Sequence, residues 1–399
     1  MTHPAAEGQM HPSGLRVSCS KSAKGGASRL TVFSPGLFRL FLACVVFAQH
    51  STRLLLGAAA VFLFFGLSGY WIATIWETDY AATRSPAFTF YVSRAWRLLP
   101  AFWVANLFAI AIAALKGRLP EAYHTVAFTP HLIPMISGNL GLLGYALLPH
   151  AERLLDTAWS LDVEVEFYLI FPLLMLLHPR WRVGAVSLAG FFGLCAILLY
   201  GEPVYRNLGY YILFFGIGLY FHHSRKVPSQ RLALTGLSLS LLCLCACCAV
   251  PELRGLVLAA NHATGESVRW SYAANAALAF IMMPFAFRTV HQPSPRHDRV
   301  LGDLSYLVYL FHVPALALLG DSYFNMSLRQ RLPALALVWI GVFAISLAFW
   351  ALVHRPLERR RKLFTSGRRT AHTAIGELTS TSVVALSDPL TEENTAAVS

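Results

Sequence analysis

Long runs of apolar residues fill most of the sequence between residues 34 and 357. Ten of these runs hold roughly 17–21 residues, which is the length that an α-helix needs to cross a ~30 Å hydrocarbon core. They cover residues 36–52, 55–76, 98–115, 160–178, 183–200, 206–222, 232–250, 271–288, 303–319 and 333–353. The pattern therefore predicts an all-α membrane protein, a polytopic bundle of about ten transmembrane helices.

Three segments interrupt or flank this pattern. Residues 119–158 are broken up by proline and glycine, so we interpret them as a long external loop that dips partly into the membrane, with an eleventh span as the alternative. Residues 1–33 are rich in Gly, Ser, Pro and Lys, and residues 358–399 are first basic and then rich in Ser and Thr. We expect both to be disordered cytoplasmic tails around one transmembrane domain, residues 34–357.

Composition and charge agree with a membrane location. Apolar residues make up 56% of the 399 residues and charged residues only 13%, against about 25% charged residues in an ordinary soluble domain. With the N-terminus inside, 22 of the 32 lysines and arginines fall in inner segments and nine in outer loops. Because cytoplasmic loops carry the excess of Lys and Arg, both termini are expected in the cytoplasm. The net charge of +12 is then a topology signal, and no nucleic-acid partner is expected.

The first span carries two ionisable residues, Arg39 and His50, and such residues are costly in lipid. Eleven positions separate them, which amounts to three helical turns plus about 20°, so they share one helix face with a rise of about 16 Å between them. With the N-terminus inside, Arg39 lies near the cytoplasmic face and His50 near the outer face. The alternatives are an arginine that reaches the lipid interface and a histidine at a helix end.

The second and third spans add small and basic residues. Gly66 and Gly69 flank Ser68, and glycines at this spacing permit close helix packing. Arg94 and Arg97 lie three positions apart, on one face at the start of the third span. Two neighbouring guanidinium groups suit phosphate recognition, while ordinary flanking charge is the alternative.

Polar stripes mark two further spans. One stripe begins just after Trp159 and consists of Ser160, Glu164 and Tyr168, which lie four positions apart. The helix dipole alone accounts for Asp162 in the first turn. The last such stripe consists of Ser305, Tyr309 and His312, and in it a buried histidine with an ordinary structural role is the alternative.

Together these elements resemble the acyltransferase 3 family of integral membrane O-acyltransferases. The resemblance spans about residues 36–357, and its five elements follow the family's order on the predicted spans. They are Arg39-x10-His50, Phe64-Phe65-Gly66-Leu67-Ser68-Gly69, Arg94-x2-Arg97-x2-Pro100, Trp159-Ser160-Leu161-x2-Glu164-x2-Phe167-Tyr168 and Ser305-Tyr306-x2-Tyr309-x2-His312-x-Pro314.

The resemblance implies a multi-pass protein of the bacterial inner membrane that moves an acyl group, usually acetyl, onto a hydroxyl of an exported or cell-envelope glycan. It assigns catalysis to His50, Arg39 and Glu164. Together with the polar stripes it leads us to expect substrate binding at Arg94, Arg97, Ser68, Trp159, Ser160, Tyr168, Ser305, Tyr309 and His312. Two elements depart from the family pattern, since Ala60-Val61-Phe62 replaces Gly-Val-Asp and His354-Arg355-Pro356 replaces Glu-x-Pro.

A mechanism follows from the expected sidedness of these residues. The phosphates of cytosolic acyl-CoA bind the cytoplasmic arginines, and the thioester reaches toward His50. His50 acts as general base on a sugar hydroxyl or accepts the acyl group transiently, and Glu164 orients the imidazole. The acceptor is a polysaccharide or lipid-linked glycan, and no metal or bound cofactor is expected.

Two other classes of protein compete with this interpretation. A transporter or flippase of a lipid-linked sugar also places Arg, His and Glu inside a membrane, but such proteins often have repeated halves, and no second copy of either polar element occurs. A scaffold that has lost its catalysis is the third class, and the presence of both His50 and Glu164 disfavours it.

Overall fold

The computed structural model describes residues 33–117, 132–149, 152–201, 206–259, 265–295, 297–320, 323 and 326–368. The expected N-terminal tail falls almost wholly outside the described residues, as does the C-terminal tail from residue 369 onward. The described residues belong to one compact unit.

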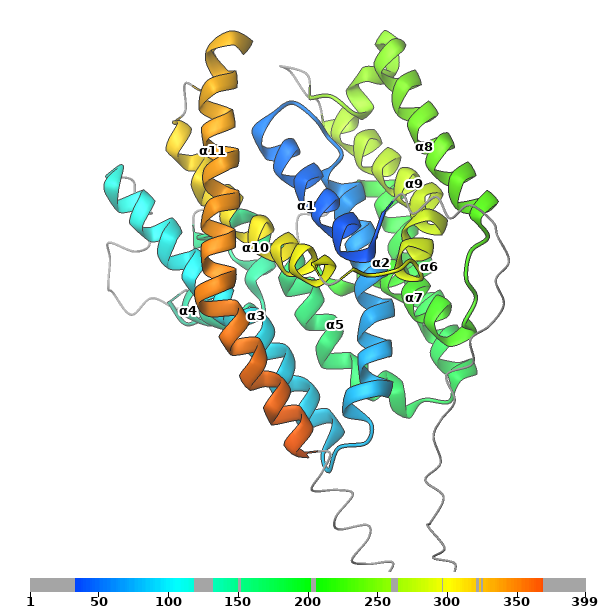
Figure 1. The fold of residues 1–399 in the computed structure, drawn as a ribbon. Coiled ribbons are helices and arrows are strands. Elements are labelled where there is room, and N and C mark those ends of the chain that lie inside the picture. The colour runs from blue at the N-terminus through cyan, green and yellow to red at the C-terminus, as the bar shows by residue number, and fades with distance from the viewer. Residues whose placement is uncertain are drawn as a thin grey trace, which may run out of the picture. The chain divides into compact units, whose positions relative to one another are not determined.

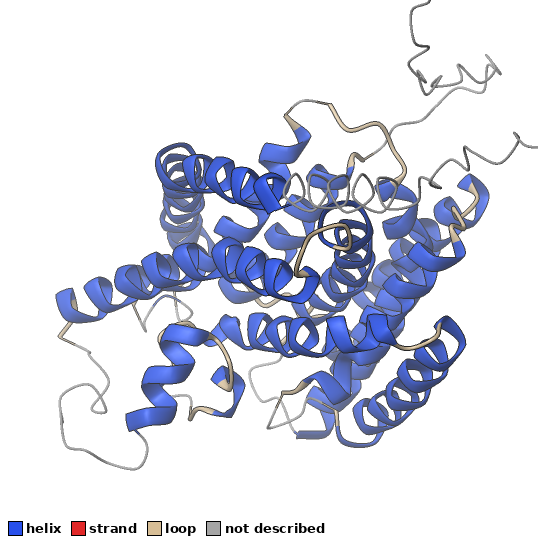
Figure 2. Ribbon diagram, turned by 90° about the horizontal axis from the view of Figure 1, so that it is seen from below, coloured by secondary structure: helices blue, strands red, loops and turns tan. Residues whose placement is uncertain are grey.

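Helices make up nearly all of the described chain (Figures 1 and 2). Within that part of the chain, the α-helices are α1 (Pro35–Ser51), α2 (Gly57–Ile75), α3 (Pro86–Leu115), α4 (Leu132–Gly141), α5 (Trp159–Leu176), α6 (Pro179–Tyr200), α7 (Leu208–Ser224), α8 (Gln230–Ala249), α9 (Gly265–Val290), α10 (Asp298–Leu316) and α11 (Leu328–Phe349). Extended pairing among these residues is limited to one antiparallel bridge between Leu54 and Leu258.

The prediction of an all-α polytopic membrane protein is confirmed. Among the described residues, seven helical segments are long and apolar enough to cross a membrane, and they contain α2, α3, α6, α8, most of α9, α10 and α11. The other three predicted spans coincide with α1, α5 and α7, of 17, 18 and 17 residues. Within residues 119–158, α4 has ten residues and a length of about 15 Å, which is too short to cross the hydrocarbon core.

Helices α1 and α10 lie in parallel and carry the two histidines of the predicted site. At their starts, the Asp298 carboxylate accepts hydrogen bonds from the Ser34 hydroxyl and from the Gly36 amide, the latter at 2.9 Å, so α10 caps the N-terminus of α1. At the other end, the Tyr323 hydroxyl donates to the Ser51 carbonyl at 3.3 Å. These contacts fix the register between the two helices.

Helices α2 and α7 approach each other through glycines. A Cβ atom added to Gly69 would lie 2.2 Å from the Phe215 carbonyl oxygen, and one added to Gly218 would lie 2.1 Å from the Gly66 carbonyl oxygen. Neither contact leaves room for a side chain, because backbone atoms cannot retreat as the end of a side chain does. The close packing predicted for the second span is therefore present.

The C-terminal helix continues beyond the domain boundary expected at residue 357. After α11, a π-helical turn covers Trp350–His354, and helix continues through residue 368. The basic composition of this segment suggested a solvated tail, but three of its side chains bond to other helices, as described below, and these contacts keep it helical.

Candidate active site

A small cavity lies among α1, α2, α5 and α10, with a volume of about 60 Å³. It brings together six of the predicted site residues from four separate segments of the sequence. These are Arg39, Ser68, Ser160, Glu164, Ser305 and Tyr309. Aliphatic and aromatic side chains, including Val61 and Phe65, form much of the remaining wall.

Glu164 is the centre of the hydrogen bonds at this cavity. Its Oε1 atom accepts one from the Ser68 hydroxyl at 2.8 Å and one from the Tyr168 hydroxyl at 2.7 Å. Tyr168 lies one helical turn further along α5, as the four-residue spacing predicted. Two donors on one oxygen hold the carboxylate in place while the cavity stays accessible to it.

Arg39 enters the same cavity from α1. Its Nε atom is buried and has no hydrogen-bond partner among the described residues. A buried N–H group without a partner is costly, and such groups in native proteins often serve a ligand. The Arg39 guanidinium and the Glu164 carboxylate therefore supply opposite charges to one cavity.

Ser160 and Tyr309 line one wall of the cavity. Their hydroxyl oxygens are 2.6 Å apart, and the Tyr309 hydroxyl donates to the Thr157 carbonyl at 2.7 Å, so Ser160 is the donor in the pair. Ser305 also lines the cavity, but its hydroxyl donates to the Gly302 carbonyl of its own helix at 2.7 Å.

The two histidines lie beyond Tyr309, side by side. The His312 ring centroid is 5.3 Å from that of His50 and 5.9 Å from that of Tyr309. His312 is fully buried, its Nδ1 atom lies 3.2 Å from the Val308 carbonyl, and its Nε2 atom has no hydrogen-bond partner in the described part of the chain. His50 is not among the residues that line the cavity, whereas Arg39, from the same helix face, is.

The paired arginines of α3 have different surroundings. Arg94 is buried, its Nη2 atom donates to the Tyr80 hydroxyl at 2.8 Å, and its guanidinium carbon lies 5.9 Å from the centre of the Tyr168 ring. Arg97 is half-buried and makes no hydrogen bond or ion pair with the described residues. It lines a separate small hollow that also contains Arg361.

Trp159 lies outside the cavity lining, at the start of α5. The Arg206 guanidinium carbon lies 4.5 Å from the centre of its ring, and the Tyr211 ring centroid lies 5.6 Å away. This position suits an anchor near the outer membrane surface.

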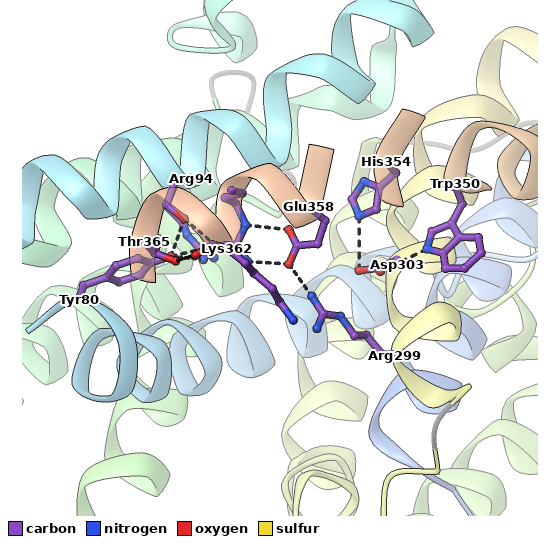
Figure 3. A network of polar contacts seen from close by, with 11 residues as sticks. Tyr80, Arg94, Arg299, Asp303, Trp350, His354, Glu358, Lys362 and Thr365 are labelled. Carbon is purple, nitrogen blue, oxygen red and sulfur yellow. Dashed lines mark hydrogen bonds and ion pairs between the residues drawn. The ribbon is translucent and has the colours of Figure 1, made fainter. Parts of the chain in front are cut away.

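Several residues near the site were not singled out from the sequence. Tyr306 lines the cavity and donates to the Leu98 carbonyl at 2.8 Å; it belongs to the fifth family element but was not assigned to the site. Asp303 lies 3.5 Å from His354 and accepts a hydrogen bond from the Trp350 indole at 3.3 Å (Figure 3). The His354-Arg355-Pro356 element, which departs from the family pattern, therefore has an acidic partner on α10.

Asp162 has a more specific role than a first-turn acid. Its carboxylate accepts hydrogen bonds from the Gly144 amide at 3.0 Å and the Ala146 amide at 2.8 Å. It therefore ties the turn after α4 to the start of α5, next to Ser160.

Comparison with known proteins identifies the family. The family model described as an acyltransferase domain, the acyltransferase 3 model, matches residues 30–354, which is most of the chain. The chain belongs to the acyltransferase 3 family. It is therefore a membrane acyltransferase, and the match covers every residue of the cavity and both histidines.

Two relatives extend this identification of the acyltransferase. The exopolysaccharide production protein ExoZ of Rhizobium meliloti (strain 1021) is 26% identical over 337 residues, covering 80% of this chain and 95% of ExoZ. Nodulation protein 10 of Rhizobium leguminosarum bv. viciae is 28% identical over 183 residues, covering 38% of this chain and 47% of that protein. No solved structure matches the acyltransferase.

Proposed function

We propose that the chain transfers an acyl group, acetyl in the first instance, from cytosolic acyl-CoA to a hydroxyl of a polysaccharide or lipid-linked glycan at the bacterial inner membrane. Membership of the family supports acyl transfer, and the name of the relative ExoZ, an exopolysaccharide production protein, supports an exopolysaccharide acceptor. The observation that carries the proposal is the cavity shared by the Arg39 guanidinium and the Glu164 carboxylate, with the two histidines beyond its Tyr309 wall.

In the proposed reaction, His50 removes the proton of the acceptor hydroxyl, and the hydroxyl oxygen attacks the thioester carbonyl carbon. The carbon–sulfur bond breaks, the acyl group stays on the acceptor oxygen, and the leaving thiolate takes the proton from His50. Imidazole suits both steps because it exchanges a proton near neutral pH. Transfer through an acyl-histidine divides the same exchange into two steps.

Arg39 and Glu164 serve the donor side of the reaction. The Arg39 N–H groups are placed to stabilise negative charge on the donor as it approaches, and an enclosed site strengthens that interaction. Glu164 balances the guanidinium charge and, through Ser68 and Tyr168, keeps one geometry. About 60 Å³ holds only a few water molecules, whereas ligand sites usually measure several hundred Å³, so the proposal requires α1 or α10 to move on substrate entry.

The proposed function is tested by acyl transfer in membranes that contain the full chain. Labelled acetyl-CoA is supplied, and label in the extracted polysaccharide is counted for His50→Ala and Arg39→Ala. We expect each variant to lose at least about 100-fold in rate, since a general base supplies that much and so does one group that stabilises developing negative charge. His178→Ala is the matched control, because His178 is exposed at the start of α6, and it is expected to keep full activity.

Full transfer by both variants at normal expression would exclude the proposed catalytic roles. Uptake of an unmodified sugar without acylation would instead support the transporter class. Mass spectrometry of polysaccharide from a deletion strain, which we expect to lack the mass of one acetyl group per modified sugar, identifies the acceptor.

A further inference from the structure

The helix that follows α11 lies against the starts of α3 and α10. We call residues 355–368 the C-terminal extension; it begins just after the family match ends at residue 354. In this extension, Arg368 Nε donates to the Thr89 hydroxyl at 2.9 Å and Arg361 Nη1 donates to the Ser93 hydroxyl at 2.6 Å. Both acceptors lie in the first turns of α3, on the side predicted to be cytoplasmic.

Two buried arginines, one from α3 and one from the C-terminal extension, meet at a neutral hydroxyl. Arg94 Nη2 lies 2.8 Å from the Tyr80 hydroxyl and Arg361 Nη1 lies 3.2 Å from it (Figure 3). Arg94 is only 4% exposed and Arg361 only 8% exposed. A hydroxyl satisfies N–H donors but does not cancel charge. Among the described residues Arg94 has no carboxylate opposite it in this poorly solvated place, and Glu358 is the partner of Arg361.

Carboxylates do not remove this excess of positive charge. Glu358 accepts two hydrogen bonds from Arg361, both at 2.7 Å, and one from Arg299 at 2.5 Å (Figure 3). Arg97 lines the same hollow as Glu358 and makes no ion pair with the described residues. The nearby Asp303 lies against His354 instead. Glu358 is thus shared by Arg361 and Arg299, and neither Arg94 nor Arg97 forms an ion pair with a carboxylate among the described residues.

We propose that the C-terminal extension completes a binding site for a phosphate-bearing anion, in which Arg361 binds the ligand together with Arg94 and Arg97. The inference rests on the proposed function, because the anion that fits is the phosphate portion of the acyl donor. Guanidinium groups bind phosphate oxygens in pairs and keep their charge when buried. Without ligand, the Glu358 carboxylate holds Arg361 in place. When the more highly charged phosphate binds, Arg361 exchanges its hydrogen bonds with Glu358 for hydrogen bonds with the phosphate.

The location joins this site to the reactive cavity. The Arg94 guanidinium carbon lies 5.9 Å from the centre of the Tyr168 ring, and the Tyr168 hydroxyl donates to Glu164 at the cavity wall. A donor held at Arg94 and Arg361 by its phosphates therefore has its remaining part next to the groups assigned to chemistry.

A lipid headgroup presents the same phosphate chemistry from a different source. The exposed face of the C-terminal extension carries Arg355, Arg359, Arg360 and Lys362, which suit the anionic surface of the inner leaflet. Arg361 points the other way, into the bundle, so we assign it to the donor.

The test is equilibrium binding of CoA to the purified full chain in nanodiscs of neutral phosphatidylcholine. Arg361→Ala is expected to weaken CoA binding about tenfold, the usual effect of losing one charge-assisted contact. The matched control is Arg360→Ala, since Arg360 is the exposed neighbour on the same helix, and its affinity is expected to equal that of the unchanged chain. Equal affinities of the Arg361 and Arg360 variants would overturn the inference.

A second variant keeps the test decisive if Arg361→Ala fails to fold. Glu358→Gln removes the carboxylate that occupies Arg361 and is expected to strengthen binding of CoA, and of inorganic pyrophosphate used alone as a probe, several-fold. Glu77→Gln, at the end of α2, is the control for loss of a negative charge, because Glu77 pairs with His222 and Arg225 instead. Equal or weaker binding by Glu358→Gln would refute the site.

Two further outcomes separate this inference from its alternatives. If Arg361→Ala changes only the effect of added phosphatidylglycerol on the protein, and not CoA affinity in neutral nanodiscs, the ligand is a lipid headgroup and the donor assignment is overturned. If the unchanged chain binds CoA through Arg361 but acylates no glycan, the anion site stands and the proposed function fails.

Discussion

At the scale of single residues, Glu164 differs from the other acids of α5. The Glu164 carboxylate faces the cavity and accepts from two hydroxyls, whereas the Glu166 carboxylate accepts the Leu208 amide at 2.6 Å, and Asp162 holds the turn after α4. Three acids within five positions thus divide into one candidate for chemistry and two that join segments of the fold.

Because Glu164 and Glu166 have different partners, we expect the same substitution to affect activity differently at the two positions. Glu164→Gln retains the shape and an acceptor oxygen but removes the charge opposite Arg39, so we expect acetyl transfer to fall about 100-fold or more. Glu166→Gln retains the acceptor for Leu208 and is expected to keep most of the activity. The measurement is label transfer to polysaccharide at equal protein levels, and similar rates for the two variants would contradict the role of Glu164.

The Asp303–His354 pair is a residue-scale feature that we expect to act on stability. Both side chains are about one-tenth exposed, and the His354 Nε2 atom lies 3.5 Å from the Asp303 Oδ1 atom. His354→Ala leaves a buried carboxylate with the Trp350 indole as its remaining side-chain partner, which costs about 1–3 kcal/mol. We expect thermal unfolding of the detergent-purified protein to occur several degrees lower.

A double-mutant cycle checks that the loss comes from the pair. Combining Asp303→Asn with His354→Ala is expected to cost less than the two single effects added together, because the second change removes an interaction that is already gone. Strict additivity would mean that the two side chains do not interact.

At the scale of helices, glycines determine how closely α2 and α7 pack. The two backbones meet at Gly66, Gly69 and Gly218, where added Cβ atoms on the last two would lie within 2.2 Å of carbonyl oxygens. This contact supports the cavity, because Ser68 lies between the two glycines of α2 and bonds to Glu164 on its other side.

Gly69→Val is therefore expected to destabilise the bundle by about 1–3 kcal/mol, since an inserted side chain must push two helices apart. The control is Gly184→Val in α6, where an added Cβ atom meets no heavy atom within 4 Å. Size-exclusion chromatography after extraction measures the folded fraction, and we expect it to fall for Gly69→Val alone. A normal profile would show that the contact tolerates separation.

At the scale of the whole molecule, the order of the helices and the distribution of charge predict one orientation. The loop that contains Arg84 is expected inside, and the turn that contains Glu252 is expected outside; both residues are exposed. A cysteine that replaces Glu252 should react with a membrane-impermeant maleimide in intact cells, whereas one that replaces Arg84 should react only after lysis. The unchanged chain gives the background from its own cysteines, and the reverse pattern would invert the topology.

The periodicity and length of the apolar runs determined almost completely where the helices lie in the sequence. Each of the ten apolar runs overlaps one helix, because a segment that crosses lipid must satisfy its own backbone hydrogen bonds. One exception is α3, which begins at Pro86, twelve residues before the run predicted at 98–115. Another lies beyond residue 357, where the charges of Glu358, Arg361 and Arg368 suggested solvent but are used for contacts with α3 and α10. Composition alone does not separate a charged tail from a charged helix that has partners.

The sequence by itself determined the class of protein, the helices and the residues that share a face, since these depend on spacing along one chain. Spacing grouped Ser160, Glu164 and Tyr168, and the resemblance joined them to Arg39 and His50. Only the tertiary structure decided which groups meet across helices. It brought Arg39 into the cavity beside Glu164 and placed Asp303 next to His354. Contacts between segments far apart in the sequence depend on helix packing, which no local pattern records.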